Sequence, residues 1–480
     1  MTTRRTVLSG AAALAGAALL GGRAGGAPGL PAPGRAIVIR QATVVSMDPA
    51  IGVAADTDVL VVDGTIAAVG KRLPTPTGAF EIQAQGALLH PGFVDTHRHL
   101  WQGAFRGAAG NWTRATWLST LMNRWAKLFR PEDIYATTYF GMIDAVNDGV
   151  TTVMNWAHNH PTPDHVEASV DALFAAPGRA RFGCGNFTDP SYQWLFDGQV
   201  DQLLATRFAR RDQRVTLQLA IDFGAPDDMV RALGFANQRH LPVSLHCGAF
   251  GTPTDDQIRF LDDQKFLTPS CTLVHADTLS DDSYRRIAAG GAYLSVSAES
   301  ESGYGQGYPA VVKAVQLGVP WSLSIDNISQ LSGDMYTAMR ATLIADHLEE
   351  HREAHQQGQQ LTGLRLRSSD VLAQATIGGA RALGLDAVTG SITPGKAADL
   401  VLLRPDTLAM TPAADPIGST VHQAGRGDVD TVLVGGQLCK FRGELVGVDV
   451  GHARQLMQQT FSYLRSRITD ADWAQAINPT

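Results

Sequence analysis

The chain contains few cysteines. Its 480 residues include four, Cys184, Cys247, Cys271 and Cys439, and each lies in or beside an apolar run that predicts a buried strand. Disulfide frameworks are typical of small secreted domains with regularly spaced cysteines, so this pattern does not predict one. We expect free, buried thiols, which behave as small apolar side chains.

An excess of basic charge is also missing. The sequence has 39 lysines and arginines against 46 aspartates and glutamates, and its formal net charge is −7. A nucleic-acid-binding domain needs clustered positive side chains, so this composition argues against that class of partner. A small-molecule substrate is the expected partner, and association into a homo-oligomer is left open.

No apolar run is long enough to span a membrane. The run from Val7 to Leu20 falls short of the ~20 apolar residues that a spanning helix needs, so stable membrane insertion is not expected. Arg4 and Arg5 precede this run, a pattern typical of a secretory signal, and the paired arginines resemble the twin-arginine type. We therefore expect residues 1–34 to be a signal peptide and linker, and the protein to be secreted or periplasmic.

What the sequence does contain is a histidine pair directly after a short apolar run. His97 and His99 follow residues 92–94, which predict a buried strand. Residues two apart on a strand point to the same side, so both imidazoles can face one metal ion. Because such a pair also arises by chance, it needs partners elsewhere in the chain.

The partners lie at the ends of three later apolar runs. His246 ends residues 242–246, His275 ends residues 272–275, and Asp326 ends residues 321–326. The catalytic residues of a (β/α)8 barrel sit where its strands end, at one face of the barrel. The shared position of these side chains predicts a single metal site.

The order of the apolar runs predicts an α/β fold with a (β/α)8 (TIM) barrel over residues 91–385. Two β-rich segments, residues 35–90 and 386–450, flank the barrel and predict one small β-sandwich built from both chain ends. Residues 451–480 predict a C-terminal helix and tail. The eight barrel strands are expected near residues 92–97, 150–155, 181–186, 215–221, 242–246, 271–275, 293–297 and 321–326.

With these motifs the chain resembles the amidohydrolase superfamily, in particular its cytosine deaminase and triazine hydrolase-like branch. The resemblance covers residues 36–450 and depends on the metal-site motifs above, on Gly149-Val-Thr-Thr-Val153, and on the stretch from Gly390 to Val401. These motifs are specific for the superfamily and much less so for a substrate.

The resemblance implies that His97, His99, His246 and Asp326 hold one divalent metal ion. Binuclear sites of the superfamily use a carboxylated lysine at the end of the fourth strand, and residues 215–221 contain no lysine, which favours a mononuclear site. Zinc is the preferred ion, with iron or manganese as alternatives for this set of imidazole and carboxylate ligands.

Catalytic roles follow from the same resemblance. Asp326 is expected to take a proton from the attacking water, and His275 to polarise the substrate or to hold that water. The alternative for His275 is an ordinary core histidine. Deaminases of this branch carry a glutamate three residues after the strand-5 histidine, where this chain has Ala249. Glu299 and Glu301, at the end of the seventh strand, are candidates to replace this proton carrier, and the alternative is a pair of solvated loop residues.

Five residues are candidate substrate contacts. Trp101, Gln102 and Arg106 follow the first histidine pair and resemble family substrate contacts, while Trp156 and His158 end the second strand. Such a pocket would suit a planar or aromatic substrate that carries a hydrogen-bonding or anionic group.

Two other patterns carry less weight. His347, His351 and His355 recur at helical spacing, but no glutamate stands where a zinc-binding helix needs it, so we expect a charged, exposed helix face. The glycine-rich residues 303–308 lack the context of a dinucleotide-binding loop and predict a mobile loop at the active site.

Together these features predict a secreted, mononuclear metal-dependent hydrolase that cleaves a carbon–nitrogen bond of a small molecule with metal-activated water. The bond belongs to an amide, a cyclic amide or an amino-heterocycle. Two alternatives are a metal-dependent lyase or isomerase on the same scaffold, and a metal-bound binding protein without catalytic activity.

Overall fold

A computed structural model describes residues 34–249 and 255–479 of the chain. The predicted signal peptide lies outside the described residues, apart from Gly34. None of the helices within the described residues is both long and apolar enough to cross a bilayer.

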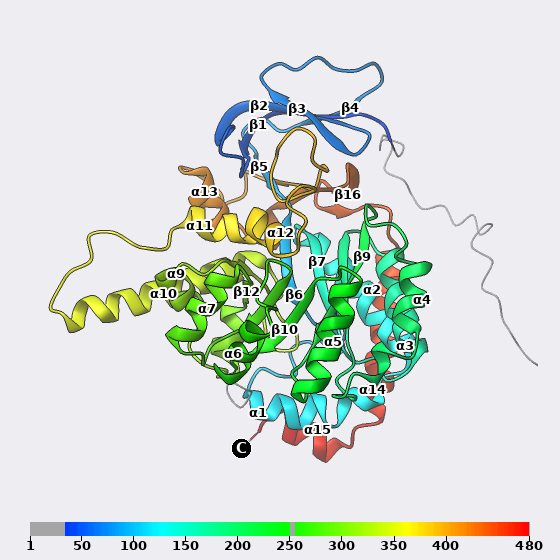
Figure 1. The fold of residues 1–480 in the computed structure, drawn as a ribbon. Coiled ribbons are helices and arrows are strands. Elements are labelled where there is room, and N and C mark those ends of the chain that lie inside the picture. Colours follow the sequence, from blue (N-terminus) through cyan, green and yellow to red (C-terminus); the bar gives the residue numbers. More distant parts are fainter. Residues whose placement is uncertain (1–33, 250–254, 480) are drawn as a thin grey trace, which may run out of the picture.

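The central element is a barrel of eight parallel strands, in the spatial order β6 to β13 (Figure 1). These strands are β6 (Phe93–Arg98), β7 (Val150–Ala157), β8 (Arg179–Cys184), β9 (Val215–Ile221), β10 (Val243–Cys247), β11 (Cys271–His275), β12 (Tyr293–Val296) and β13 (Trp321–Leu323). All eight confirm the predicted barrel. β8 lies two residues earlier than expected, and β13 ends three residues before Asp326.

The barrel closes between β6 and the segment that follows β13. The backbone N–H of His99 donates to the carbonyl of Asp326 at 2.6 Å, and the N–H of Asp326 donates to the carbonyl of His97 at 2.8 Å. The backbone that carries three of the predicted metal ligands is therefore fixed by the closure of the barrel itself.

Helices cover the outside of the barrel (Figure 1). They are α2 (Pro131–Asn147), α3 (Pro163–Ala175), α4 (Gln199–Ala205), α5 (Pro226–Gln238), α6 (Asp255–Asp263), α7 (Asp281–Gly290), α9 (Val311–Leu317), α10 (Met335–Gln356) and α11 (Ser368–Ala373). The short helix α12 (Gly379–Ala382) lies between the barrel and the mixed sheet, where Ala380 packs in one cluster with Val94 and Met154 of the barrel. Two short helices lie in connections after strands, α1 (Arg114–Trp117) after β6 and α8 (Ala298–Gly303) after β12.

A second sheet is built from both ends of the chain. Its strands are β1 (Ile37–Val45), β2 (Val53–Val62), β3 (Thr65–Gly70), β4 (Phe80–Gln83), β5 (Leu88–Pro91), β14 (Leu400–Leu403), β15 (Val429–Val434), β16 (Gln437–Phe441) and β17 (Glu444–Leu445). β14 pairs antiparallel with β5, which joins both sets into one nine-stranded mixed sheet. The predicted contribution of both chain ends is confirmed, and the predicted sandwich is a single continuous sheet.

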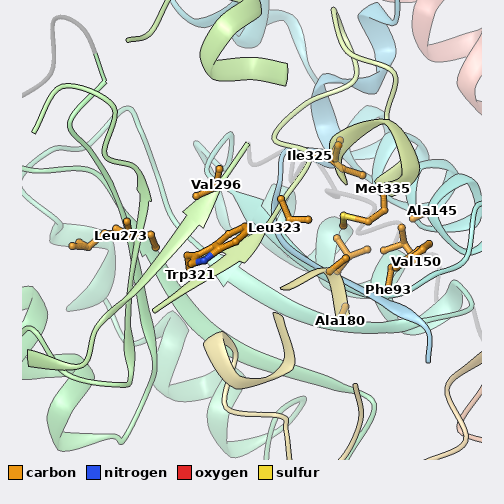
Figure 2. Packing of buried hydrophobic residues seen from close by; sticks show 14 of the residues in the cluster. Phe93, Ala145, Val150, Ala180, Leu273, Val296, Trp321, Leu323, Ile325 and Met335 are labelled. Carbon is orange, nitrogen blue, oxygen red and sulfur yellow. The ribbon is translucent and has the colours of Figure 1, made fainter. Parts of the chain in front are cut away.

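The barrel core consists of apolar side chains from strands and covering helices. Figure 2 shows Phe93, Val150, Leu323 and Met335 among the residues of this cluster, all of them fully buried. Parallel strands covered by helices are buried on both faces, which explains their continuous apolar runs. The four cysteines are buried and free, as predicted.

Two C-terminal helices, α14 (Val450–Ser466) and α15 (Asp470–Ile477), pack against the connection that follows β6. The indole of Trp473 stacks on Trp125 with ring centroids 5.4 Å apart, and Trp112 donates from Nε1 to the carbonyl of Ala476 at 2.6 Å. Helices α1 and α15 lie together at the end of the barrel opposite the mixed sheet (Figure 1). The C-terminal segment therefore supports the connection that carries α1.

Candidate metal centre and active site

Three histidine side chains and one carboxylate converge at the ends of β6 and β10 and after β13. Nε2 of His97 and Nε2 of His99 each lie 3.4 Å from Oδ1 of Asp326. Nε2 of His246 lies 3.4 Å from Nε2 of His97. The structure thus brings together all four predicted ligands, although they come from three distant parts of the chain.

Neighbouring groups fix the orientation of two of these rings. Nδ1 of His246 lies 2.7 Å from Oδ1 of Asp222, and Nδ1 of His99 lies 3.3 Å from the carbonyl oxygen of Trp156. Each contact favours the tautomer with its proton on Nδ1, which leaves Nε2 with a lone pair facing the cluster. The Trp156 indole also stacks on His246, with ring centroids 3.7 Å apart.

The electrostatics of the cluster favour neutral imidazoles and an ionised carboxylate. Burial lowers the pKa of His97 to about 4 and that of His99 to about 3. Burial acts to raise the pKa of Asp326, but the contacts with His97 and the neighbouring His99 outweigh it and hold that pKa well below its usual range. Ser300 donates a hydrogen bond from Oγ to Oδ2 of Asp326, so Oδ1 is the oxygen that faces the histidines.

These side chains fit a divalent cation. The contact with Asp222 leaves Nε2 of His246 with a lone pair, and this nitrogen lies 3.4 Å from Nε2 of His97, so a cation between the two rings could use both nitrogens as ligands. Three neutral imidazoles and one carboxylate are a ligand set that zinc accepts. The geometry therefore supports a metal centre at the predicted position.

His275 lies at the edge of this cluster and has two carboxylates on its far side. Its ring is parallel to that of His246, with centroids 5.7 Å apart, and its Nδ1 lies 3.7 Å from Oε1 of Glu301. Glu301 accepts backbone N–H groups of Ser297 at 2.7 Å and Ala310 at 3.3 Å. Burial first, and then the charge of Glu301, raise the pKa of Asp277 well above its usual range, which favours a protonated Asp277 that can share its proton with Glu301.

The backbone conformation is strained at two of these residues. His275 has φ = 76° and Asp326 has φ = 70°, the left-handed region that non-glycine residues rarely adopt. Such strain costs of order 1–3 kcal/mol per residue and persists where the surrounding structure enforces it. Here it turns each side chain at the end of a strand toward the same cavity.

A cavity of about 350 Å³ opens over the metal centre. This volume suits a small organic molecule. The described residues that line the cavity are His99, Arg114, Trp117, Leu118, Met122, Asn123, His158, Phe187, Asp222, Phe223, His246, Ala249, His275, Tyr304, Gln306, Asp326 and Asn327.

Of the five predicted substrate contacts, His158 lines the cavity and the other four do not. Trp156 packs behind the metal centre, and Trp101 is buried against Phe129. Gln102 is buried and accepts a hydrogen bond from Nε1 of Trp117, so it supports a lining residue. The position of Arg106 corrects the prediction, because its guanidinium pairs with Asp144 away from the cavity.

Neither candidate replacement for the missing proton carrier lines the cavity. Glu299 accepts a hydrogen bond from Ser332 Oγ at 2.9 Å, and burial raises its pKa. Glu301 lies behind His275, on the side away from the cavity lining. The expectation that strand 7 turns both carboxylates into the site therefore fails, because α8 carries them away after one residue. Ala249 does line the cavity, as its position in the sequence suggested.

Several lining residues were missed by sequence reasoning. Asp222 directly follows the run 215–221, so the rule that found the other strand ends applies to it as well. Arg114, Trp117 and Asn123 lie in the connection between β6 and β7, which carries no motif and whose course the sequence does not reveal.

The structure also places the two remaining sequence patterns, the histidines of α10 and the glycine-rich residues 303–308. His351 and His355 are exposed on α10, and Nε2 of His347 contacts the carbonyl of Leu366 at 2.9 Å, so this helix face is not part of the metal centre. In the glycine-rich residues 303–308, Tyr304 and Gln306 line the cavity, which places this segment at the active site.

A family comparison agrees with this geometry. Residues 88–439 match the model of the amidohydrolase family. The chain belongs to this family. It is accordingly a metal-dependent hydrolase with a (β/α)8 barrel, and its histidine and aspartate cluster occupies the strand ends.

Curated relatives of this amidohydrolase include two deaminases. A 5-methylthioadenosine/S-adenosylhomocysteine deaminase of Pelotomaculum thermopropionicum is 26% identical over 430 residues, covering 86% of this chain and 95% of the relative. A 5'-deoxyadenosine deaminase of Methanothermobacter thermautotrophicus is 27% identical over 428 residues, covering 83% and 93%.

Solved structures show the same fold. A zinc-bound adenosine deaminase from Xanthomonas campestris superimposes with a TM-score of 0.76 at 22% identity, covering 90% of this chain and 98% of that one. A zinc complex of atrazine chlorohydrolase from Arthrobacter aurescens gives a TM-score of 0.76 at 19% identity, covering 88% and 100%. At these identities the similarity concerns the fold.

Proposed function

We propose that this amidohydrolase uses one zinc ion to hydrolyse the carbon–nitrogen bond of an amide or cyclic amide in a planar small molecule. The observation that carries the proposal is Ala249. It lines the cavity three residues after His246, where deaminases of the resembling branch carry a glutamate.

The chemistry of the two bond types supports this choice. Addition of water to an amino-heterocycle places a new proton on the ring nitrogen, so a deaminase benefits from an acid beside that nitrogen. Addition of water to an amide places negative charge on the carbonyl oxygen, which a cation or a hydrogen-bond donor can stabilise. With alanine at position 249 the cavity suits the second reaction better.

His97, His99, His246 and Asp326 would hold the zinc ion. When bound, zinc acidifies water and polarises a carbonyl oxygen. Oδ1 of Asp326 faces the cluster and accepts the proton of the attacking water. Ser300 holds the other carboxylate oxygen and keeps Oδ1 in place.

His275 and Asp326 then divide the remaining steps. His275 also lines the cavity, with a ring nitrogen within 4.8 Å of a carboxylate oxygen of Asp326, and it donates a hydrogen bond to the oxygen that becomes negative. The proton held by Asp326 passes to the leaving nitrogen as the carbon–nitrogen bond breaks. Aromatic lining residues, among them Trp117 and Phe223, exclude bulk water and cover the faces of a planar substrate.

The proposal is tested with zinc-loaded enzyme and a panel of matched compounds. The panel pairs aromatic amides and cyclic amides with amino-heterocycles of similar size. We expect release of amine or ring opening with the amides and at least tenfold lower rates with the amino-heterocycles. Faster turnover of the amino-heterocycles would contradict the proposal.

A second candidate is deamination of an adenosine-like compound, which the named activities of the relatives favour. In that case Ala249→Glu, which adds the acid of the resembling branch, should raise the rate with 5'-deoxyadenosine. Wild-type deamination of 5'-deoxyadenosine faster than hydrolysis of every amide would establish this candidate in place of the first.

We further propose export by the twin-arginine route. Arg4 and Arg5 precede the apolar run from Val7 to Leu20, as in a twin-arginine signal. The metal ligands lie far apart in sequence, so the enzyme must fold before it can bind zinc. Zinc binding in the cytoplasm would therefore require a translocase that exports folded proteins. Changing both arginines to lysine should leave unprocessed enzyme in the cytoplasm. Unchanged secretion of this double variant would exclude the route.

A further inference from the structure

A cationic side chain lines the cavity. Arg114 is the only lysine or arginine among the described residues that line it. Its side chain is half-buried, and burial lowers its pKa while the charges of Asp222 and Asp326 raise it. A guanidinium stays protonated in proteins, so Arg114 brings a fixed positive charge within electrostatic reach of the metal centre.

The backbone holds Arg114 in a defined position. It is the first residue of α1, whose cap Thr113 accepts the N–H of Thr116. The N–H of Arg114 donates to the carbonyl of Tyr304 at 2.9 Å, which ties α1 to another lining residue. The side chain therefore starts from an anchored backbone and not from a free loop.

An aromatic ring lies beside this charge. Trp117 follows Arg114 by three residues, a spacing that places both side chains on one face of a helix, and both line the cavity. The indole is fixed because Nε1 of Trp117 donates to Oε1 of Gln102 at 3.1 Å. Phe187 and Phe223 add further aromatic surface to the lining.

Charge also favours an anion in this cavity. The charged side chains among the described lining residues are Arg114, Asp222 and Asp326. With a divalent ion bound, positive charges in the cavity exceed negative ones by one. A negatively charged substrate would then leave the site neutral, which reduces the cost of excluding water from it.

We propose that the substrate of this hydrolase carries a carboxylate on an aromatic or heteroaromatic ring, away from the scissile carbon–nitrogen bond, and that Arg114 binds it. The planar guanidinium matches a carboxylate through two parallel hydrogen bonds. This inference rests on the proposed function and adds the substrate class to it. It also replaces Arg106, a predicted substrate contact that lies outside the cavity, with Arg114.

A matched pair of ligands tests the proposal. 4-Carbamoylbenzoate carries an amide and a carboxylate on opposite sides of one ring, and its methyl ester lacks the charge. Their dissociation constants for the zinc-loaded enzyme are measured by calorimetry, so the comparison does not need turnover. We expect the acid to bind roughly tenfold to a hundredfold more tightly than the ester, the range for a hydrogen bond to a charged group.

Variants test whether Arg114 causes the tighter binding of the acid. Arg114→Gln should remove the preference for the acid without changing the zinc content or the binding of the ester, and Arg114→Lys should keep part of it. Arg124→Gln is the matched control, because Arg124 lies in the same connection but pairs with Asp472 outside the cavity lining. Circular dichroism and zinc content verify that each variant is folded and loaded.

Two results would overturn the proposal. One is equal binding of acid and ester by the wild type. The other is a preference that survives in Arg114→Gln and disappears when zinc is removed, which would mean that the carboxylate binds the metal. Failure of the proposed amide hydrolysis can be distinguished from failure of this proposal. In that case the acid and the ester would bind as expected, but neither would be hydrolysed.

Discussion

Oδ1 of Asp222 lies 2.7 Å from Nδ1 of His246, at the ends of two neighbouring strands of the barrel. A carboxylate in this position holds the ring of a metal-binding histidine in one tautomer and makes its other nitrogen a better ligand. The candidate metal centre therefore includes a carboxylate that would support a ligand without binding the ion itself.

This contact predicts the effect of Asp222→Asn on zinc affinity. The amide cannot stabilise the proton on Nδ1 as a carboxylate does, so we expect the dissociation constant for zinc to rise about 10–100-fold. Competition with a chelator measures it. Asp212→Asn is the control, since Asp212 pairs with Arg210 at the surface. Equal zinc affinity in wild type and Asp222→Asn would exclude the supporting role.

The number of ions is a second prediction. Protein purified without chelator should contain about one zinc ion per chain by elemental analysis, because His97, His99, His246 and Asp326 form one four-ligand site. The double variant His97→Ala, His246→Ala should lose the ion, and Asp326→Asn should lose turnover. Two ions per chain at full occupancy would contradict a mononuclear site.

Stability should depend on pH through His90, which is buried on β5. Burial lowers its pKa to about 4 in the folded protein, against 6.5 for an ordinary histidine. The unfolded chain then binds the proton more readily than the folded protein does. The free energy of unfolding is therefore highest above pH 6.5 and decreases as the pH falls from 6.5 toward 4. At about 1.4 kcal/mol per pKa unit, this loss amounts to about 3 kcal/mol.

The measurement is the free energy of unfolding by denaturant at several pH values. His90→Gln should show a smaller decrease between pH 6.5 and 4 than the wild type, whatever its absolute stability. The exposed His452 supplies the comparison variant, His452→Gln, which should follow the wild type. Parallel curves for all three proteins would show that His90 does not contribute.

The pair Asp277 and Glu301 predicts unequal effects of two similar substitutions. Asn at position 277 can donate an N–H to Glu301 in place of the shared proton, so Asp277→Asn should cost little stability. Gln at position 301 loses one of the two oxygens that accept the N–H groups of Ser297 and Ala310. Because a buried donor without a partner costs ≈ 1–3 kcal/mol, Glu301→Gln should be the less stable variant.

Thermal unfolding of both variants, zinc-loaded, measures this difference. Glu299→Gln completes the series: Glu299 accepts from Ser332 and does not line the cavity, so turnover should stay within a few-fold of wild type. If Asp277→Asn proves as unstable as Glu301→Gln, the two carboxylates do not share a proton.

The barrel and the convergence of the four candidate ligands could be predicted from the sequence, because both depend on local rules. Each barrel strand is a short apolar run, and each ligand follows such a run, so His97, His246 and Asp326 could be found without knowledge of their contacts. The same rule applies to Asp222, which directly follows the apolar run 215–221.

The cavity wall was not predictable in the same way. Arg106 and Arg114 lie eight residues apart in one irregular connection, and nothing in their local sequence tells which of them faces the cavity. Their positions depend on long-range contacts, such as the bond from Arg114 to Tyr304 and the packing of Trp125 on Trp473. Glu301 was misjudged for a related reason, since a short helix redirects the chain immediately after β12.

The mixed sheet also affects how the chain folds during its synthesis. β5 is made near the start of the chain, yet its partner β14 emerges from the ribosome more than 300 residues later, after the whole barrel. Until then β5 presents an open strand edge, which readily pairs with other chains. A chain that stops before residue 400 keeps this edge permanently exposed, so truncated products of this gene should aggregate even when their barrel sequence is complete.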